Sequence, residues 1–186
     1  MKIILLDIDG VISIDRARYS CGAPTNKADI PNKNNIHRTH IYRPDVVSSI
    51  NSLAANPNVE IKFLSNWGSA AESVFAKYVG LKNIGYTEID SEHRGYKSIE
   101  DAGESPLLWY KSKMVLEEAL KGNDVLFIDD RISLPLALEF SKHLPTQCGW
   151  IKTHPGQGLT PAHMERIRGW VNDDAPVLRY HSGEKW

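Results

Sequence analysis

Short apolar runs alternate along the chain with longer amphipathic stretches, and this alternation predicts a sheet interleaved with helices. The apolar runs lack polar alternation, which is typical of parallel strands covered on both faces. We expect strands over Lys2–Ile8, Val59–Leu64, Ile84–Ile89, Val125–Ile128 and Gln147–Ile151. The predicted architecture is therefore a three-layer α/β/α fold with a mainly parallel central sheet.

The amphipathic stretches carry residues that are typical of helix ends. Pro44 suits the first position of a helix, and Ser69 and Glu72 have the spacing of a capping box. Apolar residues within each stretch recur at helical spacing, as at Val46, Val47, Ile50 and Leu53. We expect helices from Pro44 to Asn56, from Ser69 to Gly80, over Lys111–Leu120 and Leu134–Lys142, and from Thr160 onward.

Two stretches follow neither pattern. Ser13–Tyr42 is polar and irregular, so we expect a flap or long loop there, and residues 86–106 read as a variable loop. The sequence of 186 residues suffices for one compact domain. We expect this domain to span residues 1–175, with a small insertion at 13–42, and a loosely packed tail at 176–186.

Net charge, cysteine content and the length of the apolar runs each bear on the class of protein. The net charge of −1 gives no evidence for a general polyanion-binding surface. Cys21 and Cys148 lie far apart in the sequence, which favours reduced thiols in the cytoplasm over a disulfide framework. No apolar run approaches membrane-spanning length, so we expect no membrane partner. The sequence makes no prediction of oligomeric state.

The first apolar run ends in two carboxylates, Asp7 and Asp9, and Gly10 then turns the chain. Paired like charges at the end of a buried strand are costly unless something neutralises them. A divalent cation is a natural neutraliser, and hard oxygen ligands suit Mg²⁺. This pattern predicts metal-assisted chemistry at one edge of the sheet.

Polar residues also end two other apolar runs: Ser65 follows the second strand, and Asp129 and Asp130 follow the fourth. Ligands of parallel α/β sheets bind beyond the carboxyl ends of the strands. We therefore expect these side chains to converge with Asp7 and Asp9 on one site.

These motifs, taken in order, resemble those of the haloacid dehalogenase superfamily of phosphatases and phosphotransferases. The resemblance rests on Asp7-Ile8-Asp9-Gly10-Val11, Ser65 after a strand, a lysine at a helix start and the pair Asp129-Asp130, and it covers Lys2 to about Ile151. It implies the superfamily's Rossmann-like fold. Because both insertions are short, we expect only a minimal cap.

The resemblance also implies roles for the residues. Asp7 would be the nucleophile, forming an aspartyl-phosphate, and Asp9 would protonate the leaving oxygen and later activate water. A Mg²⁺ ion would bind the Asp7 carboxylate, the Asp9 backbone carbonyl and Asp129, with Asp130 beside it. Ser65 would hold the phosphoryl oxygens. The expected substrate-binding residues are Asn66, Gly10 and Arg131.

Three assignments leave alternatives open. Lys111 and Lys113 both qualify as the motif lysine; we choose Lys111 because an apolar Val115 follows four residues later. Arg131 after the acid pair resembles the 3′-phosphatase domain of polynucleotide kinase-phosphatases, and a surface arginine is the alternative. Trp67 could stack on a base or fill the core, and we favour the core.

A narrower resemblance is to the small haloacid dehalogenase domains of RNA-repair ("Swiss army knife") proteins. It rests on Ser65-Asn66-Trp67, Trp109-Tyr110-Lys111 and Gly149-Trp150-Ile151. A weakly capped, open site favours a bulky phosphorylated substrate, so we predict a nucleic-acid-end phosphatase first and a nucleotide or small phosphoester phosphatase second. The order of the acids disfavours a receiver domain, and the full acid set disfavours a silent binding module.

Overall fold

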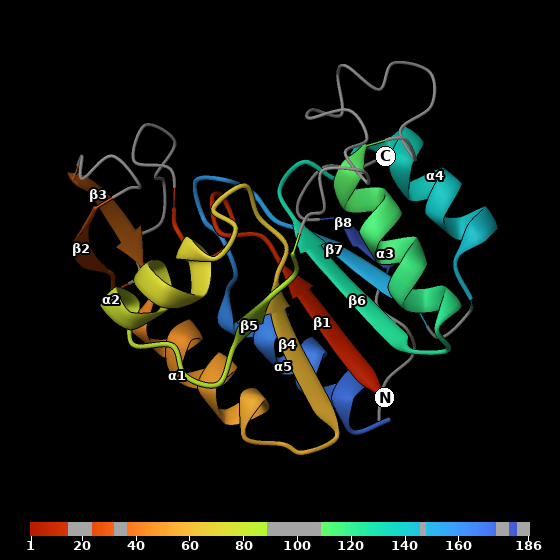
Figure 1. Cartoon of the computed structure of the whole chain (residues 1–186), viewed down its shortest axis with the longest axis horizontal. Coiled ribbons are helices and arrows are strands. Elements are labelled where there is room, and N and C mark those ends of the chain that lie inside the picture. The colour runs from red at the N-terminus through yellow and green to blue at the C-terminus, as the bar shows by residue number, and fades with distance from the viewer. Residues whose placement is uncertain (15–23, 32–36, 89–108, 146–147, 174–178, 182–186) are drawn as a thin grey trace.

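Six parallel strands form the centre of the protein in a computed structural model that describes residues 1–14, 24–31, 37–88, 109–145, 148–173 and 179–181. The strands lie in the order β5-β4-β1-β6-β7-β8 (Figure 1). Their bounds are β1 Lys2–Leu6, β4 Val59–Phe63, β5 Gly85–Tyr86, β6 Asp124–Asp129, β7 Gly149–Lys152 and β8 Arg179–His181. The predicted parallel α/β sheet is confirmed, with β1 and β6 at its centre.

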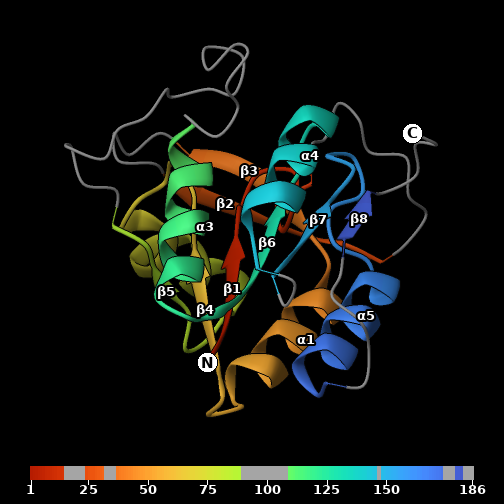
Figure 2. The same ribbon diagram turned by 90° about the vertical axis from the view of Figure 1, so that its right-hand side faces the viewer.

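Helices cover both faces of the sheet (Figure 2). Alternate residues of β1 point to opposite faces, so Ile4 packs in a core with α1 and α5, whereas Leu5 packs in a second core with α3 and α4. The helices are α1 Pro44–Ala54, the π-helical turn η2 Ala71–Ala76, α2 Lys77–Val79, α3 Tyr110–Leu120, α4 Leu134–His143 and α5 Pro161–Val171.

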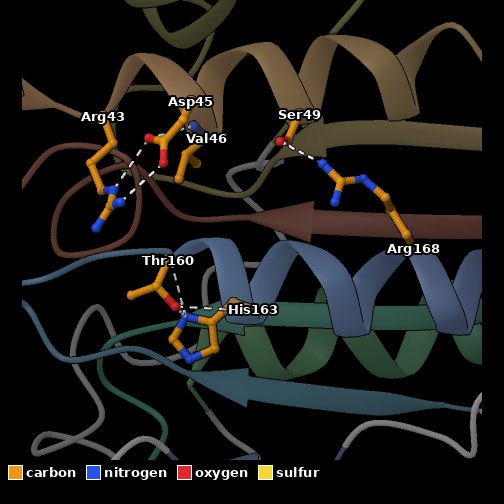
Figure 3. Close-up of polar contacts among 7 residues, drawn as sticks. All are labelled: Arg43, Asp45, Val46, Ser49, Thr160, His163 and Arg168. Carbon is orange, nitrogen blue, oxygen red and sulfur yellow. Dashed lines mark hydrogen bonds and ion pairs between the residues drawn. The ribbon is translucent and has the colours of Figure 1, made fainter. Parts of the chain in front are cut away.

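Polar contacts fix α1 and α5 against each other and at their starts (Figure 3). The Arg168 guanidinium of α5 donates to Ser49 Oγ of α1 over 2.7 Å. Thr160 is the N-cap of α5 and forms a reciprocal capping box with His163 at position N3. These contacts hold the layer that lies under one face of β1.

The insertion after β1 is not a loop throughout, as the sequence had led us to expect. It contains an antiparallel hairpin of β2 Asn26–Pro31 and β3 His37–Tyr42, which lies beside α2 in Figure 1. Ile30 and Ile41 are buried although their neighbours are polar. The pattern was missed because two buried apolar residues in a polar segment are too few to show a period of two.

Three smaller predictions also differ from the structure. Ser69 does not cap a helix: the chain already makes i→i−3 hydrogen bonds from Gly68 onward, and the following helix has no side-chain cap. The strand expected over Ile84–Ile89 is only Gly85–Tyr86 in the described part. The expected tail contributes β8, which pairs with β7 and was too short and polar to be recognised.

Some predictions fall outside the described residues, namely most of the variable loop at 86–106, the end of the strand expected to reach Ile89, and Cys21. Cys148 is buried. Among the residues described, no helix has both the length and the apolar character needed to cross a membrane.

Candidate active site

Three of the four predicted acids meet at the carboxyl ends of the two central strands. Asp7 directly follows β1, Asp129 is the last residue of β6, and the Asp7 amide donates to the Ile128 carbonyl over 3.0 Å. One carboxylate oxygen from each of Asp7, Asp129 and Asp130 lies within 4.8 Å of the others. The register of β1 and β6 therefore brings acids more than a hundred residues apart into one cluster.

Lys111 neutralises part of this cluster. It sits in the first turn of α3, and its Nζ lies 2.8 Å from Asp7 Oδ2 and 2.6 Å from Asp129 Oδ2. Lys111 and Asp129 are 3% and 0% exposed, so water screens this contact little. Burial alone would lower the pKa of Lys111, but Asp129 and Asp7 more than offset this and raise it. The lysine is therefore held as a cation between the two acids.

Asp129 and the following Asp130 remain poorly compensated despite this lysine. Burial raises the pKa of Asp129 to about 7, against the opposing effect of Lys111. Burial and the neighbouring Asp7 raise the pKa of Asp130 to about 6. Such carboxyls are destabilised as anions, and a bound cation would relieve them.

Gly10 makes room for the Asp130 carboxyl. Its φ is +76°, and a Cβ placed on it would lie 2.5 Å from Asp130 Cγ. Its carbonyl accepts a hydrogen bond of 2.7 Å from Thr153 Oγ1, which follows β7. A side chain at this position would therefore both strain the backbone and displace Asp130.

Asp9 is exposed and stands apart from the three clustered acids. Its Oδ2 accepts a hydrogen bond of 3.1 Å from the Trp67 indole Nε1. The Trp67 ring is half-buried and packs on the core below α1 and α5, as we favoured, but its N–H also reaches the site. Sequence reasoning missed this contact; the position of Trp67, two residues after Ser65, was the only signal.

The turn after β4 reaches the same rim. Ser65 is buried there, and the Leu64 amide donates to the Leu6 carbonyl over 2.8 Å, next to Asp7. The Tyr110 hydroxyl of α3 donates to Asn66 Oδ1 over 2.7 Å. Tyr110 was not predicted as a site residue, yet it ties the Ser65–Asn66 turn to the helix that carries Lys111.

The remaining predicted residues lie at the margin. Arg131 donates its backbone N–H to Asp129 Oδ1 over 2.7 Å, while its side chain is exposed. Lys113 is half-buried two residues beyond Lys111, which places it on roughly the opposite side of α3. Of the two lysines, Lys111 is the one that the structure brings to the acids.

The donor set fits a hard divalent cation. Three carboxylates offer oxygen ligands from one small volume, and no thiolate or imidazole belongs to the cluster among the described residues. Carboxylates, a buried lysine and a nearby free acid together can hold a phosphoryl group and move protons at it.

A comparison with protein families found one matching model, described as the HAD domain in Swiss Army Knife RNA repair proteins. It matches residues 3–164, which include every residue of the site described above. No curated protein and no solved structure matches the sequence.

Proposed function

Because the chain belongs to the family of HAD domains in Swiss Army Knife RNA repair proteins, we propose that it is a Mg²⁺-dependent phosphatase acting on phosphorylated nucleic-acid ends. The family supports a HAD-type phosphatase or hydrolase in general. The observation that carries the proposal is the placement of Lys111 Nζ between Asp7 and Asp129, two members of the carboxylate cluster that Asp130 completes.

In the first step the Asp7 carboxylate attacks phosphorus. A bond forms between an Asp7 oxygen and phosphorus as the bond from phosphorus to the leaving oxygen breaks, and Asp9 gives its proton to that oxygen. Lys111 remains charged and offsets the negative charge that collects between the acids and the phosphoryl group. Ser65 and Asn66 bind the phosphoryl oxygens.

In the second step Asp9 takes a proton from water as the water oxygen attacks phosphorus. The bond from phosphorus to Asp7 breaks, which releases inorganic phosphate and restores the free Asp7 carboxylate. The Mg²⁺ ligands would be Asp7, Asp129, Asp130 and the Asp9 backbone carbonyl. When bound there, the ion would offset the repulsion between the Asp7 carboxylate and the phosphate dianion.

The open side of the site supports a bulky substrate. Asp9 is exposed, and the described part of the insertion after β1 is a two-stranded hairpin and not a large folded cap. A terminal phosphate on a polynucleotide can approach such a rim. We propose the 3′-phosphate as the preferred end, on the resemblance of Asp129-Asp130-Arg131 to 3′-phosphatase domains.

The nucleophile is tested by Asp7→Asn. We expect Mg²⁺-dependent phosphate release to fall about 10³-fold or more, because an amide cannot attack phosphorus as a carboxylate does. Asp124→Asn is the matched control, since Asp124 lies at the opposite end of β6; its rate should equal that of the wild type. Wild-type rates in Asp7→Asn would remove the nucleophile assignment.

The substrate is tested with a panel of 3′- and 5′-phosphorylated DNA and RNA, mononucleotides and sugar phosphates. We expect the highest kcat/KM on a polynucleotide 3′-phosphate. A higher value on a sugar phosphate than on every nucleic-acid end would overturn the substrate proposal and leave the phosphatase chemistry intact.

A further inference from the structure

The contact between Trp67 and Asp9 joins two residues 58 positions apart, at the exposed side of the site. An indole N–H only donates, so the Asp9 Oδ2 atom that it meets is held as an acceptor. The other carboxylate oxygen of Asp9, Oδ1, is left to exchange a proton. The contact therefore distinguishes the two oxygens of the acid.

The Trp67 ring is itself held by aromatic neighbours. It packs edge-on against Phe75 at 5.5 Å and against His40 at 5.3 Å between ring centroids. His40 comes from the hairpin strand β3, is buried, and its Nδ1 lies 2.7 Å from Ser13 Oγ. The indole is thus fixed from two elements before it reaches Asp9.

The loop that carries Asp9 is anchored to the same group of residues. Ser13 pairs with Asp9 in a β-bridge, and the Ser13 carbonyl accepts from the Gly10 amide over 2.7 Å. Ser13 therefore holds the Asp9 backbone and Trp67 holds the Asp9 side chain, and both of these residues contact His40. Such a framework can hold a carboxylate within the narrow range of orientations that proton transfer needs.

We propose that Trp67 is a positioning residue that holds Asp9 by Oδ2 and directs Oδ1 toward the leaving oxygen of the substrate. This inference rests on the proposed function, in which Asp9 protonates that oxygen. It assigns Trp67 a role in the chemical step in addition to its packing. Protonation matters most when the leaving group is a poor one, such as the alkoxide of a nucleoside sugar, and little for the anion of an acidic phenol.

The test is Trp67→Phe, which keeps an aromatic ring against Phe75 and His40 but removes the N–H donor. We expect kcat/KM on a 3′-phosphorylated oligonucleotide to fall about tenfold or more, a part of the 10²–10⁴-fold supplied by a general acid. On p-nitrophenyl phosphate kcat/KM should change less than about twofold, because kcat/KM reports only the steps through departure of the leaving group, and this leaving group needs little protonation. Trp170→Phe in α5, far along the chain from the site, should leave both rates unchanged.

A second measurement reports the contact without activity. The Trp67 indole N–H resonance, identified by its loss in Trp67→Phe, should shift in Asp9→Ala. An unmoved resonance, or an equal loss of kcat/KM on both esters in Trp67→Phe, would overturn the positioning role. A wild-type protein that cleaves neither ester would overturn the proposed function itself, and with it the role given to Trp67.

Discussion

The site has two halves with opposite physical character. The buried half, made by Asp7, Lys111 and Asp129, is a set of ion pairs shorter than 3 Å that are almost fully withdrawn from water. The open half, made by Asp9 and Trp67, holds an exposed acid by one hydrogen bond from a neutral donor. One stretch of three residues after β1 joins the halves.

This difference fits a division of labour in the proposed reaction. The charged groups of the buried half must keep fixed positions during the reaction. A buried site of low dielectric suits them, because fixed charges act strongly there without reorganisation of the surroundings. A proton that must move, and a leaving group that must depart, need access to water. Asp7 and Asp9 are therefore the same residue type placed in two environments that suit two tasks.

The strongest way to break the buried half is Lys111→Met. The substitution leaves Asp7 and Asp129 facing each other in a dry site, so we expect the free energy of unfolding to fall by about 3 kcal/mol, at the lower end for removing one partner of a buried pair. Phosphate release should also be lost. Chemical denaturation measured with and without Mg²⁺ checks the first result, and a phosphate-release assay checks the second.

Lys113→Met is the matched control, because Lys113 lies on the same helix turn but away from the acids. We expect its stability to stay within about 0.5 kcal/mol of the wild type and its activity to be unchanged. The opposite ranking of the two variants would make Lys113 the motif lysine and contradict the account of the buried half.

The buried half was largely predictable from sequence and the open half was not. Asp7 and Asp129 end unbroken apolar runs, so their meeting follows from the rule that parallel strands present their carboxyl ends together. Lys111 could be selected because Val115 four residues later marks the buried face of its helix. Local pattern and topology were sufficient for these positions.

The contact from Trp67 to Asp9 depends on side-chain packing that no local pattern records. It requires the hairpin to place His40 against the indole, and the hairpin itself was taken for a loop. The strand β8 was missed for the same reason, since its pairing with β7 is visible only in three dimensions. Tertiary contacts between short polar segments are the part that sequence reasoning could not supply.

Gly10→Ala tests the residue that makes room for Asp130 beside the buried half. A non-glycine residue at φ +76° is strained by about 1 kcal/mol or more, and its Cβ would meet Asp130. Gly80→Ala is the matched control, because Gly80 has φ +84° but no atom within 4 Å of an added Cβ. We expect both variants to lose stability by thermal unfolding, and only Gly10→Ala to lose stabilisation by Mg²⁺. Equal responses to Mg²⁺ would show that Asp130 need not stay where Gly10 permits it.

The smallest expected effect is the pH dependence of stabilisation by Mg²⁺, and it belongs to the buried half and its neighbour Asp130. Burial raises the pKa of Asp129 to about 7 and that of Asp130 to about 6. In the metal-free protein, these two carboxyls therefore favour the folded state at low pH, where both are protonated. Their contribution to the free energy of unfolding is lost as pH rises through the two raised pKa values. Mg²⁺ competes with protons for the same carboxylates, so the stabilisation that Mg²⁺ provides should increase as pH rises.

We expect saturating Mg²⁺ to raise Tm by about 3–6 °C near pH 8 and by much less near pH 5. The variant Asp130→Asn should reduce the rise near pH 8. A rise in Tm that is equal at both pH values would mean that the ion does not bind these carboxylates.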